Sequence, residues 1–218
     1  MKACIFDLDG TLFDSMNVWT DIDIEFLEKR NIAIPDDYTD TVLSMSFSEA
    51  ATYTIERFSL PDSTQDLLRE WNDMAIYAYE NTVQMKPYAK EYLLSLQKQG
   101  FSLAVATSGT PELYEPALLR HGIYDCFEVI CNAREVGCGK SQPDIFLLTA
   151  KKLGLSPCDC ILFEDILPAV KSAKSIGMTV YAVYDKSSET DWDKIAKLAD
   201  GVIFDFQNAP TLKRTGEV

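Results

Sequence analysis

The feature that most constrains the fold is a regular alternation of short apolar runs with helical segments from residue 87 onward. The apolar runs, which read as strands, are Phe101–Ala106, Phe127–Cys131, Cys160–Phe163, Met178–Val183 and Gly201–Phe204. Segments with helical periodicity, such as Pro111–His121 and Pro143–Leu153, separate them. Strands connected through helices imply right-handed crossovers and a mostly parallel sheet. The sequence therefore predicts an α/β fold with a Rossmann-like core of three layers.

The first strand of this sheet is predicted at the start of the chain, and a helical insert separates it from the others. Ala3–Phe6 is a continuous apolar run, as expected of a strand that is buried on both faces. The insert shows three helical segments and no strand signal, and its second and third helices open at Ser46 and Ser63. We expect a core domain formed by residues 1–14 and 87–218, with an all-helical cap domain at residues 15–86.

Polar residues follow several of the predicted strands directly. They are Asp7 and Asp9, Thr107 and Ser108, and Glu164 and Asp165, and Lys140 lies in a glycine turn just before a helix. The carboxyl ends of parallel strands meet at one edge of the sheet, where open α/β sheets bind ligands. Acids this close together need a cation between them, and a divalent metal is the obvious candidate. Each residue alone has an ordinary explanation as a turn, a helix cap or a solvated side chain, so only their combination indicates a site.

Composition excludes several classes of partner. The net charge of −14 and the lack of a Lys/Arg block argue against binding to nucleic acid or to an anionic membrane. No apolar stretch is long enough to cross a bilayer, and the start of the chain does not read as a signal peptide. The six cysteines show neither zinc-site nor disulfide spacing. We expect a monomeric cytoplasmic protein with reduced thiols, which binds neither nucleic acid nor a membrane.

The motifs together resemble those of a known enzyme family. Asp7-Leu-Asp9-Gly10-Thr11, followed by Leu-Phe-Asp14-Ser15, is similar to the signature of the haloacid dehalogenase-like (HAD) hydrolases. Thr107, Lys140 and the Glu164-Asp165 pair stand in the order and context of that family's other motifs. The resemblance covers nearly the whole chain. The position of the helical cap resembles the subgroup that contains phosphoglycolate phosphatases, sugar phosphatases and β-phosphoglucomutases.

The resemblance implies a phosphatase that uses Mg²⁺. Asp7 would be the nucleophile that forms an aspartyl phosphate, and Asp9 would act first as general acid and then as general base. Asp7, the backbone carbonyl of Asp9 and Asp165 would hold the metal. Glu164 would lie just outside these ligands.

The remaining motif residues would bind the substrate. Thr107 and the Ser108 amide would hold phosphate oxygens, and Lys140 would neutralise charge on the nucleophile and on the transferring group. The substrate would be a small phosphate ester, either a sugar phosphate or a molecule like phosphoglycolate. Specificity would come from cap residues such as Trp19, Met45, Phe47 and Trp71.

Two alternative functions stay open at this point. β-Phosphoglucomutase-like members carry a Lys-Asn pair where this chain has Thr110-Pro111, and their cap loop contains a glycine and an arginine that Leu43–Phe47 lacks. A bisphosphate intermediate would need further positive charge, so these differences favour a phosphatase over a phosphomutase. A catalytically silent binding protein that keeps the fold is disfavoured, because all of the motif acids are present.

Overall fold

The structure, a computed structural model, describes residues 2–43, 45 and 47–213, and it divides into two compact units. The first, which we call the sheet-bearing unit, combines Met1–Met16 with Val83–Val218. The second, which we call the helical unit, is Asn17–Thr82. None of the helices in the described part of the chain combines the length and the apolar character needed to cross a membrane.

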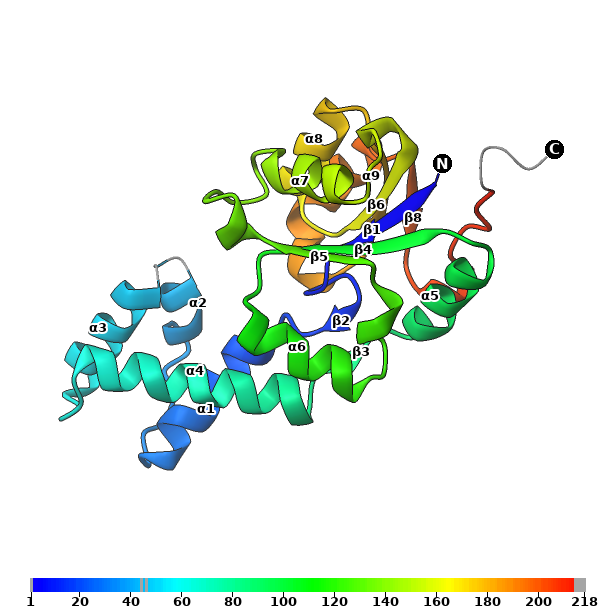
Figure 1. The fold of residues 1–218 in the computed structure, drawn as a ribbon. Coiled ribbons are helices and arrows are strands. Elements are labelled where there is room, and N and C mark those ends of the chain that lie inside the picture. The colour runs from blue at the N-terminus through cyan, green and yellow to red at the C-terminus, as the bar shows by residue number, and fades with distance from the viewer. Residues whose placement is uncertain (1, 44, 46, 214–218) are drawn as a thin grey trace. The chain divides into compact units, whose positions relative to one another are not determined.

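A six-stranded parallel sheet forms the centre of the sheet-bearing unit (Figure 1), with strand order β5-β4-β1-β6-β7-β8. The strands are β1 (Ala3–Phe6), β4 (Ser102–Thr107), β5 (Val129–Asn132), β6 (Cys160–Glu164), β7 (Thr179–Val183) and β8 (Gly201–Ile203). The predicted α/β fold is confirmed, and the apolar runs lie within about two residues of these strands. β1 lies between β4 and β6, with Ile5 paired to Ala104 on one side and Leu162 on the other.

Helices cover both faces of this sheet (Figure 1). They are α5 (Ala89–Lys98), α6 (Pro111–Arg120), α7 (Asp144–Lys152), α8 (Leu167–Ser175) and α9 (Trp192–Leu198). One face of β1 presents Ala3 and Ile5 to a core that is shared with α7, α8 and α9. On the other face, Phe6 stacks on Phe163 at 4.5 Å between ring centroids, and Tyr92 of α5 meets Phe163 edge-on. Successive residues of a strand point to opposite faces, so this one short strand joins both layers of the core.

The helical unit contains α1 (Val18–Lys29), α2 (Tyr38–Leu43), α3 (Phe47–Phe58) and α4 (Thr64–Asn81). Ser63 caps α4 by accepting a hydrogen bond from the Asp66 backbone amide at 3.2 Å. Ser46, which was expected to open α3, lies outside the described residues. The prediction of three helices missed α2, whose six residues include three β-branched ones and are too few to show a helical period.

A two-stranded antiparallel ribbon begins and ends the insertion. β2 (Phe13–Asp14) pairs with β3 (Gln84–Met85) within the sheet-bearing unit. Residues 15–16 and 83–86, which the sequence analysis placed in the cap, therefore belong to the sheet-bearing unit. Each strand has two residues, which is too short for a sequence pattern to reveal.

Candidate active site

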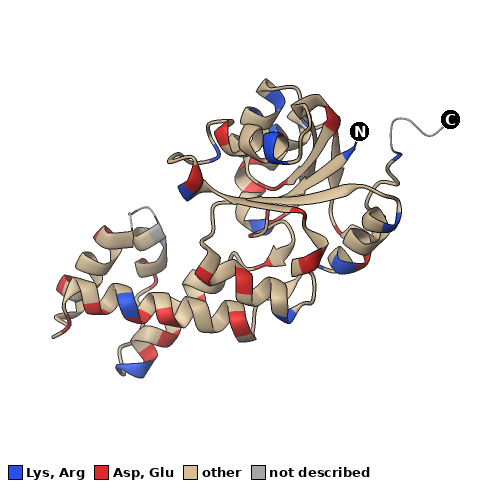
Figure 2. Cartoon of the chain, in the orientation of Figure 1, with Lys and Arg blue, Asp and Glu red and all other residues tan. Residues whose placement is uncertain are grey.

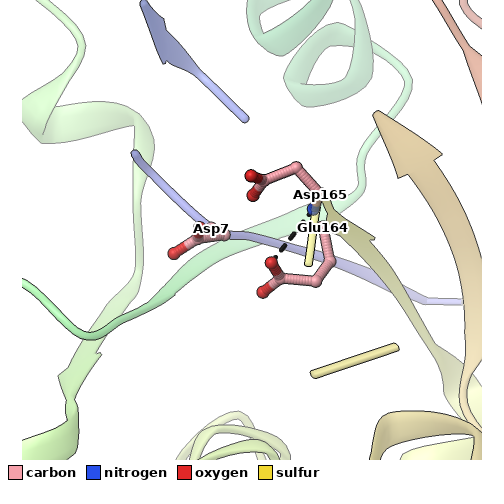
Figure 3. A group of neighbouring side chains, drawn as sticks. All are labelled: Asp7, Glu164 and Asp165. Atoms are coloured by element: carbon pink, nitrogen blue, oxygen red, sulfur yellow. Dashed lines mark hydrogen bonds between the residues drawn. The ribbon is translucent and has the colours of Figure 1, made fainter. Parts of the chain in front are cut away.

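Three acidic side chains meet at the carboxyl ends of β1 and β6 (Figure 3). Asp7 follows β1, Glu164 is the last residue of β6, and Asp165 comes next. Each offers a carboxylate oxygen, and these oxygens lie within 4.8 Å of one another. All three residues are buried. The parallel pairing of β1 with β6 thus brings together acids that are 157 positions apart in the sequence.

Lys140 provides positive charge at this cluster. Its ammonium pairs with Asp7 Oδ1 and with Glu164 Oε2, the second contact at 2.8 Å, and its side chain is 2% exposed. Burial alone would lower the pKa of Lys140, but the Asp7 and Glu164 carboxylates raise it above its ordinary value. The Lys140 backbone carbonyl accepts a hydrogen bond from Ser172 Oγ of α8 at 2.6 Å. Lys140 is therefore held as a cation at a defined position.

Glu164 has partners for both of its carboxylate oxygens. Oε1 accepts hydrogen bonds from the backbone amides of Asp165 and Ile166 at 3.0 and 3.2 Å, and the first of these is drawn in Figure 3. Oε2 accepts from Lys140. A carboxylate that is engaged in this way is better suited to fixing the lysine than to binding a metal directly.

Asp165 is satisfied on only one oxygen. Its Oδ1 accepts a hydrogen bond from Thr11 Oγ1 at 3.0 Å, whereas its buried Oδ2 has no hydrogen-bond partner among the described residues. Gly10 lies against that oxygen: a Cβ at this position would be 2.4 Å from Oδ2, and the glycine has φ +78°. Buried polar atoms are normally satisfied, so this oxygen indicates a ligand that is not part of the chain.

The charges in the cluster lead to the same conclusion. Burial raises the pKa of Asp7 to about 8, with the Glu164 carboxylate adding to the rise and Lys140 opposing it. Burial, Glu164 and Asp7 likewise raise the pKa of Asp165 well above its ordinary value. One lysine does not balance three buried carboxylates, and oxygen ligands of this kind suit Mg²⁺. The residues present therefore fit a hard divalent cation.

Asp9 and Thr107 lie beside this cluster, at the ends of β1 and β4. Asp9 Oδ1 accepts a hydrogen bond from Ser15 Oγ at 2.6 Å, and the Gly109 amide donates to Thr107 Oγ1 at 3.0 Å. A Cβ at Gly109 would lie 3.3 Å from Thr107 Oγ1 and 3.5 Å from Asp9 Oδ2, so both oxygens lie near that glycine. Ser108 follows β4 and is exposed. Every motif residue named from the sequence thus lies at the carboxyl edge of the sheet or, like Lys140, contacts residues there.

Three hydroxyl residues of this site received no role in the sequence analysis. Thr11 and Ser15 belong to the quoted motif, and their side chains now hold Asp165 and Asp9. A hydroxyl close in sequence to a candidate acid was the signal that could have identified them. Ser172 gave no such signal, because its contact with Lys140 depends on how α8 packs.

The four cap residues expected to select substrate lie together within the helical unit. Trp19, Met45, Phe47 and Trp71 line one cavity of about 200 Å³. The same cavity is lined by Asp23, Val42 and Ala50, which the sequence analysis did not name. Asp23 comes four residues after Trp19 on α1, where an acid on an otherwise apolar helix face was a signal that could have been recognised.

Comparisons with known proteins agree with this geometry. A family model described as haloacid dehalogenase-like hydrolase matches residues 1–177. Hexitol phosphatase A of Escherichia coli is 32% identical over 84% of this chain and 82% of its own. The bifunctional riboflavin kinase/FMN phosphatase of Arabidopsis thaliana is 31% identical over 87% of this chain, which spans 50% of that protein's length.

A solved structure supports the fold. A Thermotoga maritima protein assigned as a β-phosphoglucomutase superposes with a TM-score of 0.81, covering 93% of this chain and 94% of its own. The two sequences are 23% identical, so this likeness concerns the fold.

Proposed function

Because the chain belongs to the haloacid dehalogenase-like hydrolases, an enzyme family, we propose that it is a Mg²⁺-dependent phosphatase of a small phosphorylated metabolite. The observation that carries this proposal is the buried cluster of Asp7, Glu164 and Asp165, with Lys140 paired to two of the three acids. Phosphatases among the similar proteins support the reaction class.

In this proposal Asp7, Asp165 and the Asp9 backbone carbonyl hold Mg²⁺. The unpartnered Oδ2 of Asp165 supports this assignment, and so do the hydrogen bonds that already occupy Glu164. When bound, the ion would reduce the repulsion between the acids and the phosphate oxygens.

The chain's own residues would carry out two displacements at phosphorus. Asp7 attacks the phosphorus atom, a bond from Asp7 Oδ to phosphorus forms, and the bond to the alcohol oxygen breaks while Asp9 protonates that oxygen. Water then attacks the aspartyl phosphate and gives a proton to Asp9, which releases inorganic phosphate and free Asp7. Ser15 holds the Asp9 carboxylate, and Lys140 holds the Asp7 carboxylate.

Phosphate binding would fall to Thr107, Ser108 and Lys140. Thr107 Oγ1 already accepts a hydrogen bond from Gly109, so its own proton is available to a phosphate oxygen. The exposed position of Ser108 after β4 is compatible with an amide that donates to a second oxygen. These oriented donors would allow a protein of net charge −14 to bind an anion.

The substrate class is a small phosphate ester such as a sugar phosphate. A hexitol phosphatase among the similar proteins supports this choice over phosphoglycolate. The fold match to a protein assigned as a β-phosphoglucomutase keeps a phosphomutase as the second candidate. Thr110 and Pro111, which stand at the start of α6 in place of a Lys-Asn pair, count against it because neither supplies a positive charge for a second phosphate.

The decisive experiment compares the wild type with Asp7→Asn and with Asp159→Asn. Asp159 lies at the opposite end of β6 from Asp165, so its variant controls for removing one carboxylate from the same sheet. With an aryl phosphate and Mg²⁺, Asp7→Asn should lose essentially all turnover, whereas Asp159→Asn should keep it. Mass spectrometry of acid-quenched wild-type enzyme should detect a phosphoryl group on Asp7.

Retained turnover in Asp7→Asn would exclude the aspartyl phosphate mechanism. A hexose 1-phosphate supplied with a bisphosphate activator distinguishes the two candidate reactions. Release of inorganic phosphate supports the phosphatase, and formation of the 6-phosphate isomer supports the mutase.

A further inference from the structure

The helical unit contains a second place where a buried acid lacks a partner. Asp23 is 9% exposed and lines the cavity formed with Trp19, Phe47 and Trp71. No hydrogen bond or ion pair to its carboxylate occurs among the residues that the structure describes. Burial raises the pKa of Asp23 to about 6, so it carries a charge at neutral pH without a cation beside it. Burying a charge without a partner is costly, and such acids are normally paired.

Aromatic rings surround this acid. The Trp19 and Phe47 rings meet edge-on at 5.1 Å between centroids, and the Phe47 and Trp71 rings lie 5.6 Å apart. Trp71 is buried, whereas Trp19 and Phe47 are 36% and 43% exposed, so one side of the ring cluster is open. Ring faces carry partial negative charge and attract cations, most strongly when the cation loses its water.

The charge of the whole helical unit adds to this attraction. The unit carries fourteen of the chain's 34 acidic residues but only four of its 20 basic ones. Figure 2 shows acidic residues along its helices with few basic ones among them. Arg30 and Arg57 are already paired, the first with Asp62 and Glu70 and the second with Asp37. A unit with this balance raises the local concentration of cations and repels free anions.

We propose that this cavity binds a small organic cation, namely an alkylated ammonium group, with Asp23 as counter-ion and Trp19, Phe47 and Trp71 as the surrounding rings. Its volume of about 200 Å³ is below the range typical of drug-sized ligands, so it suits a head group of this size. A neutral apolar group would leave the Asp23 charge unpaired, and a metal ion would find only one carboxylate. The proposal concerns binding alone and does not depend on the proposed reaction at Asp7.

The test measures the binding of two ligands of nearly the same shape to the full-length protein. Choline carries the quaternary ammonium, and 3,3-dimethylbutan-1-ol replaces its nitrogen with carbon. Intrinsic tryptophan fluorescence follows binding, because two of the three tryptophans line the cavity. We expect choline to bind at least about tenfold more tightly than the neutral alcohol.

Three variants test whether the preference for choline arises at the cavity. Asp23→Asn keeps the side-chain shape and should remove the preference for choline. Asp21→Asn, which removes an exposed charge from the same helix, should retain it. Phe47→Leu keeps an apolar wall without a ring and should weaken the binding of choline more than the binding of the alcohol.

Each contrary result would overturn the proposal. Equal affinity for the two ligands would mean a merely apolar cavity, and absence of binding by either would mean no site. An equal loss in Asp21→Asn and Asp23→Asn would mean nonspecific attraction to an acidic surface. None of these binding measurements depends on hydrolysis. A protein without phosphatase activity would therefore not contradict the proposal.

Discussion

The two units bury acidic side chains in different ways: one unit pairs its acids with its own residues, and the other leaves a buried acid unpaired. In the sheet-bearing unit Asp7 and Glu164 share Lys140, and backbone amides and Thr11 satisfy most of the remaining oxygens. In the helical unit Asp23 lies among rings without a partner in the described chain. The first acids are fixed in position by their own network, whereas in our proposal a bound cation neutralises Asp23.

The largest effect should follow from removing the lysine of that network. Lys140→Met leaves Asp7 and Glu164 without their buried cation, so we expect a loss of about 3–5 kcal/mol in the free energy of unfolding, together with loss of turnover. Urea unfolding measures the first effect. As the control, Lys194→Met breaks a pair with Asp191 that is largely solvated and should cost less than about 1 kcal/mol. Equal losses in the two variants would mean that burial gives the Lys140 pairs no more weight than a solvated pair has.

Metal binding should also distinguish the carboxylate cluster of the sheet-bearing unit from Asp23. At a Mg²⁺ concentration 100 times its dissociation constant, the wild type should gain about 2.7 kcal/mol of stability, measured as a rise in melting temperature that a chelator reverses. Asp165→Asn should lose most of this gain, because it changes the acid whose Oδ2 has no partner in the described chain. Asp23→Asn should keep it. A gain that persists in Asp165→Asn would place the metal elsewhere.

A pair of glycine substitutions tests how closely the site is packed. Gly10 and Gly154 both have positive φ, but only a Cβ at Gly10 meets a neighbour, Asp165 Oδ2, whereas nothing lies within 4 Å at Gly154. Gly154→Ala should cost about 1 kcal/mol from backbone strain alone. Gly10→Ala should cost roughly 1–2 kcal/mol more and weaken Mg²⁺ binding, because Asp165 must move. Chemical denaturation and a metal titration measure the two effects.

The smallest effect concerns the stability of the ligand-free helical unit. The pKa of Asp23 is raised from 3.8 to about 6, so the folded state holds a proton in this range that the unfolded state has lost. Stability from this group therefore falls as pH rises from about 4 to 6 and stays low above that. Asp23→Asn removes the penalty and should stabilise the protein at pH 8 by on the order of 2 kcal/mol, with less gain toward pH 4. A matched Asp21→Asn variant should change little.

The sequence predicted the structure best where a pattern of residues is compatible with a single arrangement of strands. The apolar runs Ala3–Phe6 and Cys160–Phe163 became neighbouring strands, because parallel pairing is what alternating strands and helices produce. Their terminal acids could then be placed at one edge of the sheet. The contact of Ser172 with Lys140 could not be foreseen, because the rotation of α8 against the sheet sets it.

The helical unit was harder to foresee because its contacts arise between helices. Trp19, Met45, Phe47 and Trp71 were named as candidates, but spacing within each helix could not show that they face one cavity. Asp23 gave a signal as an acid on an apolar helix face, but its position beside Phe47 and Trp71 of two other helices could not be foreseen. The short α2 and the β2–β3 ribbon gave no periodic signal.

That ribbon has a consequence for how the chain could be shortened. Asp14 and Gln84 face each other as cross-strand partners, so the chain leaves and returns to the sheet-bearing unit at one place. In effect the ribbon is a hairpin whose turn has been replaced by the helical unit. Replacing residues 15–83 with a two-residue Asn-Gly turn would connect Asp14 to Gln84 and restore the hairpin. Such a miniature chain would retain every residue of the carboxylate cluster and lack the aromatic cavity altogether.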